Sequence, residues 1–310
     1  STFMGGDAKI VRIETDVDNG RKLLIFKDSY GNALAPYVLS SFEEVYMADY
    51  REFKLNALDF IKEHHQEPFF MYLCTNDIHV PRFPHPRFRG KTKMGHRSDA
   101  IVQFDWTVGQ VLSTLNKLGI DKNTIILLTS DNGPVVDDGY ADQAVELLGN
   151  HKPSGPLRGN KYSSFEGGTR VPFIVTWPEN IRKELTSEAL VSQIDLFQSF
   201  AQLLNATLPK GACPDSRGHW SSIVGEDNVG CPYVIEQNLW NVLSVRTLDW
   251  KYIEPSNGNS YMQLTNIETG NNPEPQLYNM EQSFEEINIA PQHPEIVEQL
   301  QSILKQEKSK

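Results

Sequence analysis

Asp131 and Asn132 offer side-chain oxygens at the end of an apolar run, in the stretch IILLTSDNGPVV at residues 125–136. Oxygen ligands suit hard cations such as Ca²⁺ or Mg²⁺, whereas zinc prefers nitrogen and sulfur. Ca²⁺ takes about six to eight oxygen ligands, so its remaining ligands would have to come from elsewhere in the chain. The stretch therefore indicates one part of a divalent-cation site.

The Asp-Asn-Gly sequence is also typical of a hairpin turn, because Asn and Gly tolerate positive φ. It occurs first at residues 18–20, between two segments of alternating apolar and polar residues, and there we predict a hairpin over residues 9–28. In the second copy the apolar run 125–128 is continuous, which is typical of a strand covered on both faces. A long, polar, turn-rich segment follows Gly133. The residues alone leave a ligand site and a simple strand-end turn both open.

Three basic side chains could contact an anionic substrate. Lys161 lies in a Gly-rich loop ahead of an apolar segment, and its amine is a compact donor for an anionic oxygen. His79 follows the apolar segment 68–73, where an imidazole can donate to an oxyanion or protonate a leaving group. His151 shares the long segment after Asn132. For all three, ordinary solvent exposure is the alternative interpretation.

Other polar residues are expected to be structural. Glu166 and Arg170 are four residues apart and are predicted to form an ion pair. The remaining histidines have no convergent context, and we expect them to be structural or solvent-facing: His64, His65, His85, His96, His219 and His293. The three cysteines lack the spacing of a disulfide framework or a zinc site, so we expect buried or idle thiols: Cys74, Cys213 and Cys231.

Composition excludes several classes of function. The 310 residues carry a formal net charge of −11 with no basic stripe, which argues against nucleic acid as the main partner. A small anionic substrate stays possible, because a site needs only local positive charge. No apolar run approaches the length of a membrane span. The chain opens without Met or a signal peptide, and we expect a processed or truncated product.

The order of apolar segments predicts an α/β protein. We expect strands near residues 68–73, 124–129 and 171–177, and helices over about 48–65, from about 101 to Gly119, and 188–204. Strands alternating with helices favour a mostly parallel sheet flanked by helices. After about residue 230, closely spaced short strands predict a small antiparallel sheet, closed by an amphipathic helix over 293–306. We therefore expect a catalytic-type region at 1–225 and a small α+β subdomain at 226–310.

Several stretches together resemble one family. The segments SDNG and PLRGNKYSSFEGGTRVPFIV resemble the C-terminal signatures of type I sulfatases, in the alkaline phosphatase superfamily. The earlier ALDFIKEHHQEPFFMYLCTNDIHVP and the later SVRTLDWKYIEP and QLYNMEQSFEEINIAPQHPEIVEQL are similar to other parts of that family, in the family's order. The resemblance covers the chain from about residue 45 onward, and is nearest to bacterial arylsulfatase-like enzymes that act on sulfated glycans.

The resemblance implies roles for the candidate residues. Asp131 and Asn132 would bind the divalent cation, usually Ca²⁺, with Mg²⁺ possible. Lys161 would contact the sulfate oxygens, and His79 the sulfate or the bridging oxygen. His151 is a further candidate for contact with the substrate, a sulfated carbohydrate or an aryl sulfate ester. The nucleophile of such enzymes is a formylglycine made from Cys or Ser in Cys/Ser-x-Pro-x-Arg. By the same analogy we expect an exported enzyme.

The formylglycine motif of the family is not found where the resemblance would place it. Ser154 to Arg158 formally fit Ser-x-Pro-x-Arg, but they lie inside the Lys161 signature, and no helix-starting pattern follows. In CPDSR, which begins at Cys213, the proline is one place too early. We therefore expect this chain to hold part of an active site that an N-terminal part completes. The alternatives are a phosphohydrolase of the same superfamily and a non-catalytic, sulfatase-like remnant.

Overall fold

The computed structural model describes residues 10–18, 22–27, 42–49, 57–181, 185–281 and 285–309. The chain divides into two compact units, residues 1–124 and 125–310, and each is described by itself. This division falls inside the longer of the two regions expected from the sequence. The boundary at 225/226 stays a prediction about the organisation of the second unit.

A four-stranded sheet forms the centre of the first unit. Its order is β1 (Ile10–Glu14), β3 (Glu44–Asp49), β2 (Lys22–Lys27) and β4 (Phe69–Leu73). β2 runs parallel to both β3 and β4, while β1 is antiparallel to β3. The predicted hairpin over 9–28 is therefore wrong, because β3 lies between the two strands that the hairpin would have paired.

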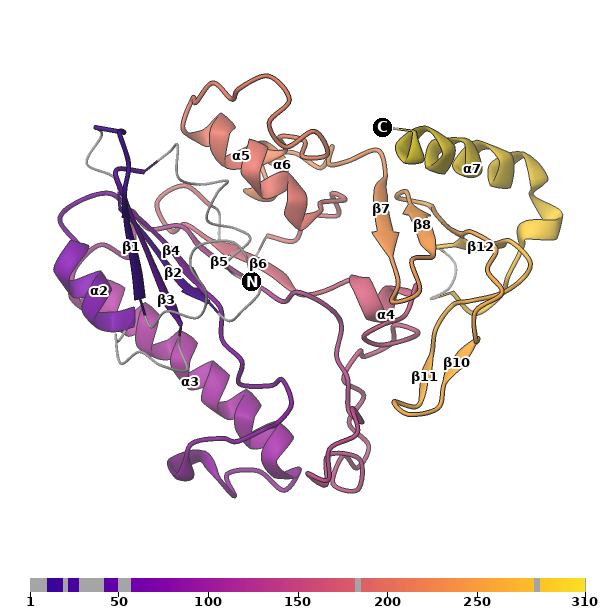
Figure 1. Cartoon of the computed structure of the whole chain (residues 1–310), viewed down its shortest axis with the longest axis horizontal. Helices are drawn as coiled ribbons and strands as arrows, with labels where there is room; N and C mark the ends of the chain where they lie inside the picture. The colour runs from indigo at the N-terminus through magenta and orange to yellow at the C-terminus, as the bar shows by residue number, and fades with distance from the viewer. Residues whose placement is uncertain are drawn as a thin grey trace. The chain divides into compact units, whose positions relative to one another are not determined.

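Two helices lie alongside this sheet and pack against each other: α2 (Ala57–His64) and α3 (Gly95–Lys117) (Figure 1). A short helix, η3 (Pro86–Phe88), precedes α3. The helix predicted over 48–65 begins too early, since Ala48 and Asp49 belong to β3; residues 50–56 lie outside the described part. Gly119 ends α3 as expected: it adopts φ +71°, and the Ile120 amide donates to the Leu115 carbonyl at 3.1 Å.

The second unit begins with a two-stranded pair, β5 (Ile126–Thr129) and β6 (Phe173–Thr176). The pair is antiparallel, with Leu127 opposite Val175, so the expected parallel arrangement is wrong for these two strands. All four residues of β5 are half-buried rather than covered on both faces. Four short helices follow or flank the pair: α4 (Glu166–Thr169), η4 (Gln193–Asp195), α5 (Leu196–Leu203) and α6 (Trp220–Ile223). The helix predicted over 188–204 is confirmed only in its second half.

The antiparallel sheet expected near the end of the chain is confirmed. Its order is β12 (Gln276–Asn279), β9 (Trp250–Ile253), β8 (Leu243–Arg246) and β7 (Val234–Gln237), and a small ribbon joins β10 (Tyr261–Met262) to β11 (Ile267–Glu268). After η5 (Ala290–Gln292), the helix α7 (Pro294–Lys308) packs on β8 and β9 (Figure 1). The core between them contains Tyr252, Leu277, Leu300 and Leu304.

A buried ion network connects this sheet to α4. The Lys251 ammonium is fully buried and lies 3.2 Å from Glu166 and 2.7 Å from Glu236. It also lies 3.6 Å from the carboxylate of Glu285, which is itself fully buried. The predicted Glu166–Arg170 pair is confirmed at 3.5 Å, and it is one edge of this larger network. Paired in this way, the buried charges hold the loop before β6 against the C-terminal sheet.

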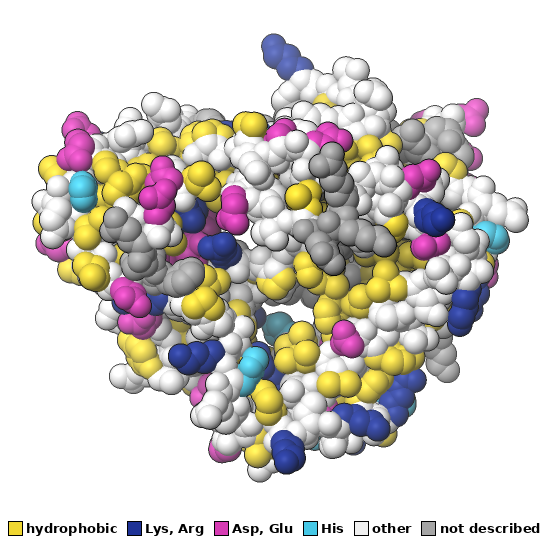
Figure 2. Space-filling view, turned by 180° about the vertical axis from the view of Figure 1, so that it is seen from behind, with side chains coloured by type: hydrophobic (Ala, Val, Ile, Leu, Met, Phe, Trp, Pro, Cys, Tyr) yellow, Lys and Arg dark blue, Asp and Glu magenta, His cyan; other side chains and the backbone are white. Residues whose placement is uncertain are grey.

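On the face shown in Figure 2, acidic and basic side chains are intermixed, with broad areas of uncharged surface between them. Among the described residues, no helix is long and apolar enough to cross a membrane.

Candidate active site

Asp131 and Asn132 follow β5 without turning directly into another strand. The partner strand β6 begins only at Phe173, so residues 130–172 separate the two strands and the simple hairpin interpretation does not hold. Asp131 is exposed, and its Oδ1 accepts hydrogen bonds from the Asn132 amide at 2.9 Å and the Ser130 hydroxyl at 3.5 Å. The other carboxylate oxygen, Oδ2, takes part in neither of these two bonds.

The end of β5 is bonded directly to the loop that carries Lys161. The Gly133 amide donates to the Gly168 carbonyl at 2.9 Å, and the Lys161 amide donates to the Pro134 carbonyl at 2.8 Å. The structure therefore brings together the backbones of the two stretches that carry the predicted cation ligands and the predicted anion-binding lysine. These stretches are separated by about thirty positions in the sequence.

Glycine makes this approach possible. A Cβ atom added at Gly133 would lie 1.8 Å from the Gly167 carbonyl oxygen, and one added at Gly167 would lie 2.1 Å from the Gly159 oxygen. Both distances are far below van der Waals contact, and the neighbouring atoms are backbone, which cannot move aside easily. The Gly-rich character of the loop is thus required by close backbone packing.

Tyr162, directly after Lys161, is a residue that sequence reasoning did not single out. It adopts φ +80°, a conformation that side-chain-bearing residues rarely take, and its hydroxyl donates to Asp138 at 3.1 Å. Burial, together with this bond to the Asp138 carboxylate, raises the pKa of Tyr162 to about 12. Strained backbone of this kind is frequent at functional sites. The Lys161 ammonium lies 5.2 Å from the Tyr162 ring centre, so the strained residue also supports the lysine side chain.

His151 lines a pocket of about 540 Å³ within the second unit. Polar and apolar side chains line it in similar measure, and the polar ones are Asp137, His151, Lys152, Ser154, Asn160, Thr265 and Asn266. Asp131, Asn132 and Lys161 do not line this pocket, although Asn160 is the neighbour of Lys161. The pocket is large enough for a sugar ring, and its mixture of hydroxyl, amide and charged groups suits a polar ligand.

His79 belongs to the first unit and follows β4, as predicted. The side chain is exposed, and its Nδ1 lies 2.7 Å from the Val80 carbonyl oxygen. If Nδ1 carries the proton, as this contact favours, Nε2 is left as an acceptor. The proximity of His79 to the other three candidates stays a prediction.

The residues present fit a hard cation in type. A carboxylate and an amide oxygen are the ligands that Ca²⁺ and Mg²⁺ prefer, and Asp131 is exposed. Ser154, by contrast, does not resemble a formylglycine precursor in its surroundings. Its hydroxyl donates to the Asn160 side chain at 2.8 Å, no helix begins in the described residues directly after it, and Arg158 is bonded to Glu268 at 2.8 Å.

The family model for sulfatases matches residues 18–206, a range that includes Asp131 and Lys161. The match covers more than half of the chain, and the chain belongs to the sulfatase family.

Among its relatives, the N-acetylgalactosamine-6-O-sulfatase of Bacteroides thetaiotaomicron is 48% identical over 255 residues, which cover 82% of this chain and 50% of that protein. Mouse N-acetylgalactosamine-6-sulfatase is 36% identical over 155 residues, covering 49% of this chain and 28% of that protein. The chain thus spans half or less of the length of the curated relatives that it matches.

Solved structures show the same fold. One, from work on the metabolism of multiple glycosaminoglycans by Bacteroides thetaiotaomicron, superimposes with a TM-score of 0.80 at 44% identity, covering 87% of this chain and 58% of that one. The PsFucS1 sulfatase of a Pseudoalteromonas species superimposes with a TM-score of 0.66 at 21% identity, covering 82% and 51%. The second likeness concerns the fold alone.

Proposed function

We propose that this chain is part of a sulfatase that hydrolyses sulfate esters of a carbohydrate of the N-acetylgalactosamine 6-sulfate class. One observation carries the proposal: in a member of the sulfatase family, the segment with Asp131 and Asn132 is bonded through its backbone to the segment with Lys161. The substrate class is supported by the two relatives named for that sulfated sugar. An exported enzyme acting on glycans outside the cytoplasm would suit this class.

In this proposal the second unit provides the electrostatic part of the site. Asp131 and Asn132 contribute oxygens to a Ca²⁺ or Mg²⁺ ion, which when bound would draw electron density from the sulfate group. Lys161 donates to a sulfate oxygen and stabilises negative charge as the ester bond breaks. His79, from the first unit, would donate to the sulfate or protonate the leaving oxygen through Nε2, which requires the doubly protonated imidazole. The formylglycine nucleophile would come from protein outside these 310 residues.

The sugar would be recognised next to the sulfate site. The pocket lined by His151 has groups that can donate to and accept from sugar hydroxyls, notably Asn160 and Asn266. Because Asn160 and Lys161 are adjacent, a ligand in the pocket would have its sulfate on the lysine side of the loop. We therefore propose that His151 binds the sugar rather than the sulfate.

Sulfate release tests the proposal. The assay would use the whole natural polypeptide that contains residues 1–310, with 6-sulfated N-acetylgalactosamine as the substrate and Ca²⁺ in excess. Asp131→Ala and Lys161→Ala should each lower kcat/KM by about 10²–10³, because each removes charge stabilisation from the transition state. His151→Ala should mainly raise KM. Lys305→Ala is the control, since Lys305 is exposed on α7.

Three results would overturn the proposal. Sulfate release that survives both substitutions would exclude the cation and lysine roles. Release of phosphate from the corresponding phosphate ester, without release of sulfate, would indicate a phosphohydrolase. Binding of the sulfated sugar without hydrolysis would indicate a non-catalytic relative.

A further inference from the structure

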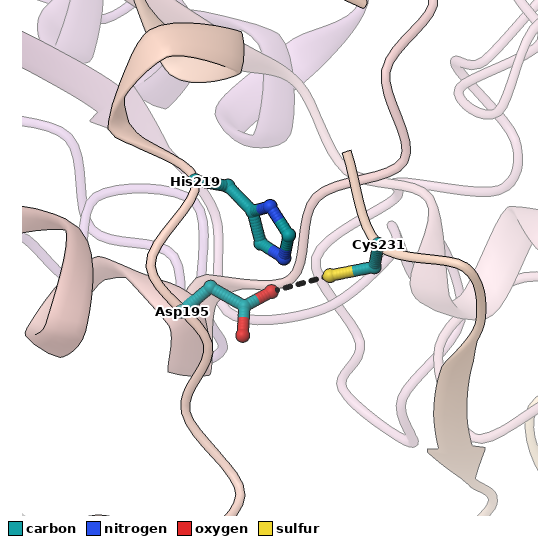
Figure 3. A group of neighbouring side chains, drawn as sticks. All are labelled: Asp195, His219 and Cys231. Atoms are coloured by element: carbon teal, nitrogen blue, oxygen red, sulfur yellow. Dashed lines mark hydrogen bonds between the residues drawn. The ribbon is translucent and has the colours of Figure 1, made fainter. Parts of the chain in front are cut away.

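Three side chains from separate segments of the second unit meet outside the candidate active site. Asp195 ends η4, His219 precedes α6, and Cys231 precedes β7. One potential ligand atom from each residue lies within 4.8 Å of the others. Figure 3 shows the carboxylate, the imidazole ring and the sulfur turned toward one another. The three residues are far apart in the sequence, so their spacing does not predict this cluster.

The carboxylate and the thiol are held in fixed positions. The Cys231 sulfur lies 3.0 Å from Asp195 Oδ2, and both residues are buried, with 6% and 1% of their surfaces exposed. The Arg217 amide donates to Asp195 Oδ1 at 2.8 Å, and the Ser192 amide donates to Oδ2 at 3.1 Å. The backbone thus orients the carboxylate before any ligand arrives, which is the usual arrangement around metal-ligating groups.

The His219 imidazole has a buried ring nitrogen that faces the carboxylate and the thiol. The Nε2 atom of His219 is buried, and no described residue forms a hydrogen bond with it. The residue is nevertheless tied down, because the His219 amide donates to the Ser199 hydroxyl at 2.9 Å. A buried nitrogen without a partner is costly, and such atoms in folded proteins are normally satisfied by protein, by water or by an ion. The ring edge that faces Asp195 and Cys231 is therefore the place where a ligand would bind the imidazole.

A nucleophilic triad is the obvious alternative for Cys, His and Asp, and the surroundings exclude it. Cys231 is nearly inaccessible, so a substrate could not reach its sulfur. A disulfide is also excluded, since Cys74, Cys213 and Cys231 are all free.

We propose that Asp195, His219 and Cys231 form a site for a divalent cation of the zinc class. Sulfur, imidazole nitrogen and carboxylate oxygen together are a ligand set for zinc, whereas Ca²⁺ and Mg²⁺ require oxygen alone. At tetrahedral zinc, with bonds of about 2.0–2.3 Å, ligand atoms lie roughly 3.3–3.8 Å apart. In the cluster the Cys231 sulfur lies 3.0 Å from Asp195 Oδ2, and all three ligand atoms lie within 4.8 Å of one another. Small shifts would bring them to a common ion, with a water molecule as the fourth ligand. Binding converts the Cys231 thiol to a thiolate and releases its proton to solvent.

The site would cross-link the second unit. Its ligands come from the segment before α5, the segment before α6 and the entry to β7, where the Cys231 amide also donates to the Leu190 carbonyl at 2.6 Å. An ion that binds the folded state and not the unfolded state stabilises the fold in proportion to its concentration above its Kd. The inference does not rest on sulfatase activity, because none of the three residues lies in the proposed active site.

Cobalt and zinc test the site directly in the 310-residue chain. Co²⁺ bound to a thiolate absorbs in the near ultraviolet, so titration of the reduced chain should produce this absorption with one equivalent. Calorimetry with Zn²⁺, in excess Ca²⁺ to occupy any oxygen site, should give the same stoichiometry. In His219→Gln and Cys231→Ser the affinity for Zn²⁺ should fall by at least about tenfold. Cys213→Ser removes a thiol outside the cluster and should bind like the parent chain.

A second measurement separates loss of binding from loss of folding. Zn²⁺ should raise the Tm of the parent chain and of Cys213→Ser, but not that of His219→Gln, whose melting without metal should still be cooperative. The proposal is overturned if the parent chain gives no thiolate absorption with Co²⁺. It is equally overturned if His219→Gln and Cys231→Ser bind Zn²⁺ as tightly as the parent, since the ion would then lie elsewhere.

Discussion

At the scale of single residues, Gly133 and Gly167 control how closely the two halves of the proposed sulfate site approach each other. Their backbones pack so tightly that neither position has room for a β-carbon. The side chains that would do the chemistry, Asp131 and Lys161, are placed by main-chain hydrogen bonds between these segments. The two glycines are therefore positioning residues, and they should be sensitive to the smallest substitution.

Gly133→Ala should destabilise the chain by at least about 2 kcal/mol, because the new methyl group would meet a backbone oxygen at 1.8 Å. Denaturant unfolding measures the loss. Gly109→Ala is the matched control: Gly109 lies inside α3 with nothing within 4 Å of an added Cβ, so alanine should stabilise by about 0.5–1 kcal/mol. Equal stability of Gly133→Ala and the parent would mean that this approach is not as close as described.

Individual residues show which features of the candidate site can be predicted from the sequence and which cannot. The sequence singles out Asp131 and Asn132 because polar residues end an apolar run, and Lys161 because it lies in a Gly-rich loop, and their roles stay predictions. The unusual backbone of Tyr162 has no sequence signal, since a tyrosine is not expected at positive φ. His219 was expected to be structural because its neighbours in the cluster are distant in sequence and become neighbours only through folding.

At the scale of elements, the ion network links α4 to the C-terminal sheet through Lys251. Its acidic members differ in charge state. Burial raises the pKa of Glu285 to about 7, whereas Lys251 and Arg246 keep the pKa of Glu166 below its usual range despite burial. Near neutral pH, Glu285 therefore exchanges its proton while Glu166 stays charged. The contact between the two elements should depend on pH over the range in which Glu285 titrates.

Glu285→Gln should remove part of the pH dependence of stability. Between about pH 4.5 and 7 the folded chain keeps a proton on Glu285 that the unfolded chain has released, so stability falls as the pH rises through this range. The parent chain should lose stability between pH 5 and pH 8 and the variant should not. The difference between their free energies of unfolding should therefore shift in favour of the variant, by at most roughly 3 kcal/mol. Urea unfolding at several pH values measures the difference. Glu286→Gln, at an exposed position, is the control. If the free energy of unfolding of Glu285→Gln changed with pH in the same way as that of the parent chain, the prediction would be wrong.

Elements also differed in how far they could be predicted. α3 and α7 were predicted well, because each has a continuous helical pattern of apolar residues, and Gly119 ends the first. The pairing of β1 failed, since alternation identifies a strand but not its partner, and β3 lies between β1 and β2. The direction of β6 relative to β5 also failed, because the loop that separates them is long enough to allow either direction.

At the scale of the whole molecule, the net charge of −11 opposes approach to a polyanion. The rate constant for association of the 310-residue chain with a long sulfated polysaccharide should therefore rise severalfold when salt is raised from about 20 to 150 mM, because salt screens this repulsion. A sulfated monosaccharide, with little charge, is the control and should change less. Stopped-flow or surface-based binding measures both. Slower association at higher salt would instead show that a local basic surface attracts the polymer.

The bond between the Lys161 amide and the Pro134 carbonyl has one more consequence. It ties together the two ends of a long excursion of the chain, which also includes His151 and much of the pocket wall. A long loop of this kind can change its length or its side chains while the hydrogen bond that joins its two ends stays in place. In the proposed function, evolution could then exchange the part that would bind the sugar without disturbing the part that would act on the ester, and an engineer could do the same by transplanting residues 135–160 between relatives.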